Sequence, residues 1–154
     1  MKTKTYSKKS KSTKKIFTRK TRSYSNKYTQ QTIVLMFLQM LNTVKLYHWK
    51  TYSYAQHKAS DELYSELNTN IDSFVETMLG KKGNRVNLMN VKSLPLDDYT
   101  NLNSFKAKVD QYRNFLINMT EDADLNITNN SDLLNIRDEI LGNINQFLYL
   151  ITFH

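Results

Sequence analysis

Residues 48–76 read HWKTYSYAQHKASDELYSELNTNIDSFVE, with two histidines and five carboxylates, of which Asp61, Asp72 and Glu76 are spaced like ligands. Apolar residues recur through this segment at intervals of three and four, which is typical of an amphipathic helix. Thr51, Tyr52 and Ser53 interrupt the pattern, and Ser53 is a residue type that caps helix N-termini. The segment therefore predicts the end of one helix, a tight reversal at residues 51–53, and a second helix over residues 54–79 that stops at Gly80.

The rest of the chain extends this pattern to four helices. We expect the others at residues 31–50, 101–122 and from 131 to the end, with a long connection at 81–98 that holds the only proline, Pro95. Two helices, a long connection and two more helices are typical of a ferritin-like, all-α four-helix bundle. We expect one domain at residues 29–154, preceded by an arm at 1–28. The predicted core consists of Ile33, Val34, Phe37, Met40, Leu41, Val44, Tyr47, Leu63, Leu67, Ile71, Phe74, Val75, Met78, Leu102, Phe105, Val109, Tyr112, Leu116, Met119, Leu133, Ile136, Ile140, Ile144, Phe147 and Ile151.

The composition excludes several classes of protein. There is no cysteine, which removes disulfides, thiolate metal sites and cysteine nucleophiles. The longest apolar run, residues 33–41, is interrupted by Gln39 and is much shorter than the ~20 residues that span a bilayer. The first residues lack the apolar stretch of a secretory signal. We therefore expect a soluble intracellular protein without membrane partners.

The arm at residues 1–28 holds half of the positive charge of the chain. It carries eleven Lys or Arg and no acid, whereas the remainder carries eleven basic and fourteen acidic residues. Such an arm should be disordered alone and should bind polyanions without sequence preference, with Tyr6, Phe17, Tyr24 and Tyr28 able to stack on bases. A solubilising or targeting tail, or contacts with other proteins, are the alternatives. The candidate DNA-binding residues are Lys2, Lys4, Lys8, Lys9, Lys11, Lys14, Lys15, Arg19, Lys20, Arg22 and Lys27.

The second helix carries a candidate metal stripe. At about 100° per residue, His57, Asp61, Asp72 and Glu76 fall at roughly 0, 40, 60 and 100°, on one face. Imidazole and carboxylate without thiolate suit iron. Asp61 and Asp72 are about 16 Å apart along the helix, so the stripe divides into His57/Asp61 and Asp72/Glu76. A solvated acidic face is the alternative, although Asp72 and Glu76 repel each other at this spacing.

Within one chain, neither half of this stripe has enough ligands to hold a metal ion. The third and fourth helices offer no matching motif, and the only other histidine besides His48 is His154. A twofold-related copy with its second helix antiparallel would set its Asp72 and Glu76 beside this chain's His57 and Asp61. In one continuous helix His48 and His57 would lie about 180° apart, whereas the reversal at 51–53 lets them face each other. The sequence therefore favours a site between subunits.

These residues resemble those of Dps, the small ferritin-like DNA-binding proteins of starved cells. The likeness is carried by His48-Trp49, His57-x3-Asp61 and Asp72-x3-Glu76, over roughly residues 45–80. The pattern HWKTYSYAQHKASDELY is also similar to ferritin-like proteins of phages and large DNA viruses. The interval from His48 to His57 is three residues shorter than is usual for Dps, and the turn lacks the usual glycine.

The resemblance implies a twelve-subunit cage in which peroxide or dioxygen oxidises Fe²⁺ at twofold interfaces. By analogy, His48, His57 and Asp61 come from one subunit and Asp72 and Glu76 from the next, with Trp49 beside the iron. The arm would hold DNA, in the cytoplasm, on the nucleoid, or in the virion if the chain is viral. Two other hypotheses stay open: a structural virion or nucleoid component with a vestigial metal site, and a monomeric bundle without metal.

Overall fold

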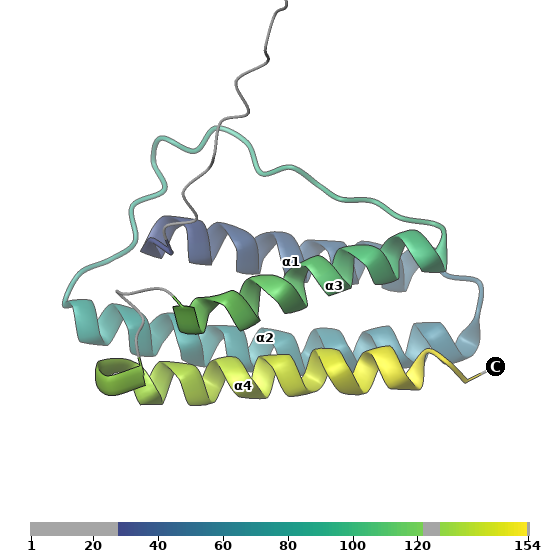
Figure 1. Ribbon diagram of the computed structural model, residues 1–154. Coiled ribbons are helices and arrows are strands. Elements are labelled where there is room, and N and C mark those ends of the chain that lie inside the picture. Colours follow the sequence, from purple (N-terminus) through teal and green to yellow (C-terminus); the bar gives the residue numbers. More distant parts are fainter. Residues whose placement is uncertain (1–27, 122–126, 154) are drawn as a thin grey trace, which may run out of the picture.

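The computed structural model describes residues 28–121 and 127–153, and this part of the chain is all-helical (Figure 1). It contains α1 (Gln30–Lys50), α2 (Tyr54–Lys82), α3 (Leu102–Asn118), the short 3₁₀ helix η1 (Met119–Glu121) and α4 (Ile127–Leu150), and no strand. The predicted arm, apart from Tyr28, lies outside the described residues, as do all of its candidate DNA-binding residues. None of the described helices is both long and apolar enough to cross a membrane.

The four helices lie alongside one another in a single bundle (Figure 1). α2 packs against α1 on one side and α4 on the other, and α3 packs against α4 and α1. α1 and α2 are antiparallel because the turn between them is short. Residues 83–101 then run back along the bundle, so that α3 is parallel to α2 and α4 is antiparallel to both.

The reversal between α1 and α2 lies where the sequence predicts it. Thr51 ends α1 in an extended conformation, and its N–H donates to Tyr47 O at 3.0 Å. Ser53 begins α2 as its N-cap, because its side-chain oxygen accepts from the N–H of Gln56. The α1–α2 turn is thus determined by local capping, and it fixes the distance between the last turn of α1 and the first turn of α2.

The predicted end of α2 at Gly80 is wrong. The helix continues to Lys82 and ends at Gly83, whose φ of 65° lies in the left-handed region and whose N–H donates to Leu79 O. A residue in the left-handed conformation ends a helix in this way, and glycine adopts that conformation without a clash because it has no Cβ. Lys81 and Lys82 are good helix formers, and their positive charges interact favourably with the negative C-terminal end of the helix dipole.

The other helix ends differ by a few residues from those predicted. α3 stops at Asn118 and tightens into η1, where the buried Arg137 donates to Leu116 O at 2.6 Å and to Thr120 Oγ1 at 2.9 Å. α4 begins at Ile127 rather than at 131, but Asn130 is not helical (φ −135°, ψ 28°), so the regular helix starts after it. It ends at Leu150 and not at the chain end.

The connection at residues 83–101 is held against the bundle by polar contacts and contains no helix. Asp97 accepts from Gln39 Nε2 at 2.7 Å and pairs with Lys108 Nζ at 2.7 Å, while Asp98 pairs with Lys50. These contacts join the connection to both α1 and α3. They fix its return path along the outside of those two helices.

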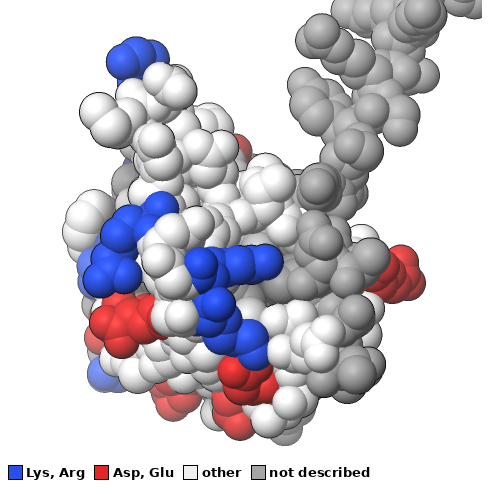
Figure 2. All heavy atoms as spheres, turned by 90° about the vertical axis from the view of Figure 1, so that its left-hand side faces the viewer, with Lys and Arg blue, Asp and Glu red and all other residues white. Residues whose placement is uncertain are grey.

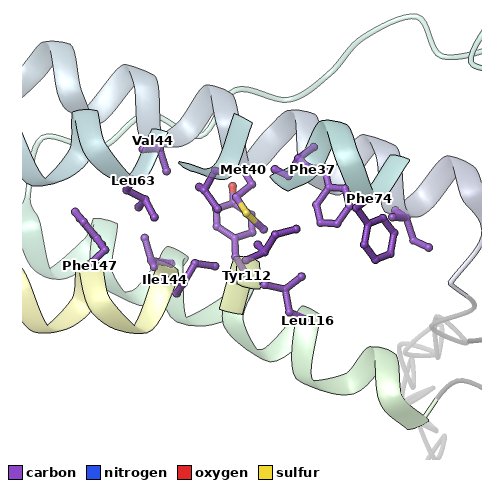
Figure 3. Packing of buried hydrophobic residues seen from close by; sticks show 14 of the residues in the cluster. Phe37, Met40, Val44, Leu63, Phe74, Tyr112, Leu116, Ile144 and Phe147 are labelled. Carbon is purple, nitrogen blue, oxygen red and sulfur yellow. The ribbon is translucent and has the colours of Figure 1, made fainter. Parts of the chain in front are cut away.

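A single apolar core lies between the four helices (Figure 3). The Phe37 and Phe74 rings meet edge to face at 5.2 Å, and the Tyr47 and Phe105 rings stack at 3.8 Å. The predicted core is confirmed, because all its members are buried except four that are half-buried. Those four are Leu41, Val75, Leu102 and Ile136.

The centre of the bundle holds a neutral polar pair. The Tyr112 and Thr43 hydroxyls are 2.7 Å apart and buried, and Thr43 donates to Gln39 O. Burial raises the pKa of the Tyr112 phenol above its ordinary value, because the charged phenolate is disfavoured away from water. Among the described residues no carboxylate is buried in this core. The core that the described residues form therefore offers no carboxylate-bridged metal centre of the kind found inside many four-helix bundles.

We expect the Tyr112→Phe variant to lose about 1 kcal/mol of unfolding free energy at pH 7, the usual contribution of one hydrogen bond. A raised folded-state pKa means that the stability from neutral Tyr112 is full below pH 10 and is lost as the pH rises above it. The deficit should therefore shrink at pH 10.5 in urea titrations. Tyr52→Phe, at a fully exposed phenol, is the matched control. An equal deficit at both pH values would contradict this account.

Candidate metal centre

The α1–α2 turn brings two histidines into contact. His48 lies in the last turn of α1 and His57 in the first turns of α2. Their rings stack with centroids 3.9 Å apart and planes inclined by 22°. His48 is buried and His57 is half-buried. The reversal at residues 51–53 thus lets His48 and His57 face each other, as the sequence predicts.

Each histidine is oriented by the backbone of the other. His48 Nδ1 is 3.1 Å from His57 O, and His57 Nδ1 is 3.0 Å from His48 O. A carbonyl oxygen only accepts, so each Nδ1 carries a proton and donates it. In the neutral imidazole the lone pair is then on Nε2. Backbone carbonyls commonly fix metal-binding histidines in this way, which makes both Nε2 atoms candidate ligands.

Asp61 completes the cluster. Its Oδ1 lies 3.6 Å from His48 Nε2, and its side chain is about half exposed. With Nδ1 protonated, Nε2 of a neutral His48 and the carboxylate oxygen are both acceptors and repel each other. A cation between them removes that repulsion. Two nitrogen or oxygen ligands of one metal ion at about 2.1 Å lie roughly 3 to 3.5 Å apart, which is near this separation.

Two further residues border the cluster that sequence reasoning did not identify. Lys45 Nζ is 3.8 Å from Asp61 Oδ1 and lies over the rings of Tyr64 and Trp49 at 4.6 and 5.8 Å. Ser60 is fully buried, and its hydroxyl lies 3.5 Å from His48 Nδ1. The spacing could have indicated that Lys45 lies near His48 and Ser60 near His57, each three residues away on the same helix. It could not have indicated that Lys45 reaches Asp61 on the other helix.

The other two predicted ligands lie farther along α2. Asp72 and Glu76 are exposed on the same helix. Asp72 lies about 16 Å from Asp61 along the helix axis, and Glu76 lies farther still. Over residues 28–121 and 127–153, no three His, Cys, Asp or Glu side chains converge closely enough to hold a metal ion. Within the described residues the predicted ligands therefore form two separate groups, and His154 lies outside the described residues.

A shallow apolar groove between α1 and α2 contains Asp72. It has a volume of about 260 Å³, and Leu38 at its edge is 40% exposed. Trp49, farther along α1 beside Lys45, is 67% exposed. The residues that line the groove are Val34, Phe37, Leu38, Leu41, Asn68, Ile71, Asp72 and Val75.

The contact between Lys45 and Asp61 leads to a prediction about metal affinity. A divalent ion at Asp61 must displace the Lys45 ammonium or bind beside it, and either is unfavourable. We expect Lys45→Gln to bind Co²⁺ or Fe²⁺ several-fold more tightly than the wild type, as measured by anaerobic titration of the Trp49 fluorescence. Lys50→Gln is a control on the same helix, paired with Asp98 instead. Equal affinities in wild type and Lys45→Gln would show that Lys45 does not compete.

The fold and this cluster define an all-helical protein of four helices with an imidazole–carboxylate group at its α1–α2 turn. The chain belongs to a family of unknown function, DUF5856, whose profile matches residues 48–151. The match begins at His48 and includes the five predicted ligands. No curated protein and no solved structure matches the chain.

Proposed function

We propose that this protein is a Dps-like mini-ferritin that binds Fe²⁺ at sites shared by two copies of the chain and oxidises it with dioxygen or peroxide. The observation that carries the proposal is the histidine pair. Both Nδ1 atoms are directed at carbonyl oxygens, and His48 Nε2 lies 3.6 Å from Asp61 Oδ1. Neutral imidazole and carboxylate, without thiolate, form a donor set that suits iron.

The helix order supports a ferritin-like assignment. A long connection that makes the second and third helices parallel is the arrangement found in ferritin-like bundles. Residues 83–101 run between α2 and α3 in this way (Figure 1). The neutral pair of Tyr112 and Thr43 occupies the centre of the bundle, whereas the candidate carboxylate ligands Asp61, Asp72 and Glu76 are exposed.

A twofold dimer would complete the half-sites. The centres of His57/Asp61 and Asp72/Glu76 are about 22 Å apart along α2, with their midpoint near Leu67. We place the twofold axis of the dimer at the level of Leu67 along α2, so that the two copies of α2 are antiparallel. His57 and Asp61 of each chain would then lie beside Asp72 and Glu76 of the other, which gives two equivalent sites. The apolar groove between α1 and α2 supplies surface for this contact. A closed shell of twelve copies is the assembly that the Dps resemblance implies.

The residues at such a site would have distinct tasks. The imidazoles favour ferrous iron before oxidation, and the carboxylates neutralise the greater charge of Fe³⁺ before it is deposited as mineral. Each oxidation passes one electron from Fe²⁺ to the oxidant. The eleven basic residues of the arm would hold DNA near this reaction, without sequence preference, in the cytoplasm, on the nucleoid or in a virion.

The test is whether the purified protein oxidises Fe²⁺ faster than buffer and whether Asp61 and Glu76 are required. We expect both the Asp61→Asn and Glu76→Gln variants to lose the fast phase while circular dichroism keeps the helical signal. Oxidation kinetics equal to those of the wild type in both variants would show that the proposal is wrong.

A structural role is the second candidate function. It is favoured by the Lys45–Asp61 ion pair, which partly satisfies the carboxylate without metal. In this case the bundle would be a virion or nucleoid component, and its arm would contact other proteins. Assembly that needs the arm, together with iron oxidation no faster than buffer, would favour this function.

A further inference from the structure

The last turn of α2 and the connection that follows it are rich in positive charge. Between Glu76 and Asp97 the chain has no acidic residue but four basic ones, and all four are exposed. In the view onto the end of the bundle where α2 stops, Figure 2 shows Lys and Arg side chains across the face, with Asp and Glu side chains bordering them. The four are Lys81, Lys82, Arg85 and Lys92.

Most positive charges elsewhere on the bundle are paired. Six of the eleven Lys and Arg side chains in the described residues form ion pairs, Lys81 with Asp132 among them. Five have no ion pair within the described part of the chain, and three of these five fall in residues 82–92. The unpaired ones are Lys58, Lys82, Arg85, Lys92 and Lys106.

The basic arm joins the bundle at this same end. Tyr28, which follows Lys27, is buried, donates from its hydroxyl to Phe115 O at 2.8 Å, and contacts the Phe115 ring at 4.9 Å. Tyr28 also lines a hollow of about 240 Å³ together with Lys81 and Lys82. The segment that carries the eleven basic residues therefore joins the described residues at Tyr28, beside Lys81 and Lys82.

We propose that Lys82 and Arg85 form a fixed contact with the phosphate backbone of duplex DNA, at the base of the arm. This inference rests on the DNA binding proposed above and places part of it on the folded bundle. Guanidinium and ammonium groups are the usual phosphate donors, and Arg85 offers a bidentate fork. Lys81 contributes less, because Asp132 and Asn129 O already hold its ammonium at 2.7 Å.

The charge pattern favours a polyanion over an acidic protein surface. The unpaired cations of residues 82–92 continue an arm that has no acid in 28 residues, so the charge is of one sign over both segments. The regular repeat of DNA phosphates can neutralise both segments at once by counterion release. Contacts of this kind carry no base-reading element, so affinity should not depend on sequence.

The experiment compares two double variants of the full chain. Lys82→Gln/Arg85→Gln removes the proposed contact, and Lys58→Gln/Lys106→Gln removes the same charge from unpaired lysines near the starts of α2 and α3, at the opposite end. Binding to a 30-bp duplex, of two unrelated sequences, is measured across a salt series. Each phosphate contact contributes about 0.9 to the slope of log K against log salt. We expect Lys82→Gln/Arg85→Gln to lower that slope by about 1.8, and the control to leave it unchanged.

The possible outcomes separate this inference from the proposed function. If the wild type binds DNA and both double variants keep its slope, the contact is refuted while DNA binding by the arm stands. If the wild type does not bind DNA, both the proposed contact and the proposed DNA binding by the arm are wrong. If only the Lys82→Gln/Arg85→Gln variant changes the assembly size and DNA binding is unaffected, the patch is a protein interface and the inference is wrong. A Lys82→Arg/Arg85→Lys variant should retain the wild-type slope.

Discussion

Mixing the Asp61→Asn and Glu76→Gln variants should restore about a quarter of the wild-type iron-oxidation rate, although each variant alone is inactive. The reason is the symmetry of the proposed dimer. Each site takes His57 and Asp61 from one chain and Asp72 and Glu76 from the other. In a mixed dimer one site carries both changes and the other carries neither, so half of its sites are intact. Random exchange makes half of all dimers mixed, which gives about one quarter of the sites.

The loss in each variant alone should be large. Removing a group that only orients a metal ligand already costs about 10- to 100-fold, so removing a ligand should cost at least about a hundredfold in initial rate. The measurement is the initial rate of Fe³⁺ formation after anaerobic Fe²⁺ loading, before and after subunit exchange in mild denaturant. Glu62→Gln, at an exposed carboxylate next to Asp61 in sequence, is the matched control. No recovery on mixing, with both variants inactive and exchange verified, would place all the ligands in one chain.

We expect Leu38→Glu to separate the dimer and to abolish iron oxidation together. Leu38 is 40% exposed at the edge of the groove that also contains Asp72. In the proposed dimer this groove is covered, so a glutamate there would be buried without a partner. Burying an unpaired charge costs about 3 kcal/mol or more, which weakens association roughly a hundredfold or more.

Analytical ultracentrifugation over a concentration series measures this change directly. Ile117→Glu places the same charge at a residue of α3 that is 46% exposed, and it should leave the association unchanged. Each variant should keep the helical signal, because both residues are already partly in water. If Leu38→Glu stays associated while Ile117→Glu separates, the subunits meet through the face that bears α3 instead.

Sequence reasoning predicted most of the fold because the signals were local. Apolar periodicity placed the four helices, and a serine able to cap predicted the start of α2 at Tyr54. The end of α2 was misplaced by three residues because two glycines, Gly80 and Gly83, are each able to end a helix. Only the backbone conformation distinguishes them, since Gly83 alone has a positive φ.

The candidate site was predictable only in part. The stripe of His57, Asp61, Asp72 and Glu76 follows from helix geometry, and so does its division into two halves. The approach of Lys45 to Asp61 depends on how α1 and α2 pack, since the ammonium crosses from one helix to the other. That contact depends on the angle and distance between two helices, which periodicity does not encode.

The amino-acid sequence alone was sufficient to predict four helices, a reversal at residues 51–53 and a core, because capping and periodicity act over a few neighbouring residues. Tertiary packing decided how the His48 and His57 rings stack, which carbonyl each Nδ1 meets, and where Lys81 and Lys82 lie relative to Tyr28. Those features join residues on different helices or on either side of the turn. Their geometry is determined only when the apolar faces of the helices come together and exclude water.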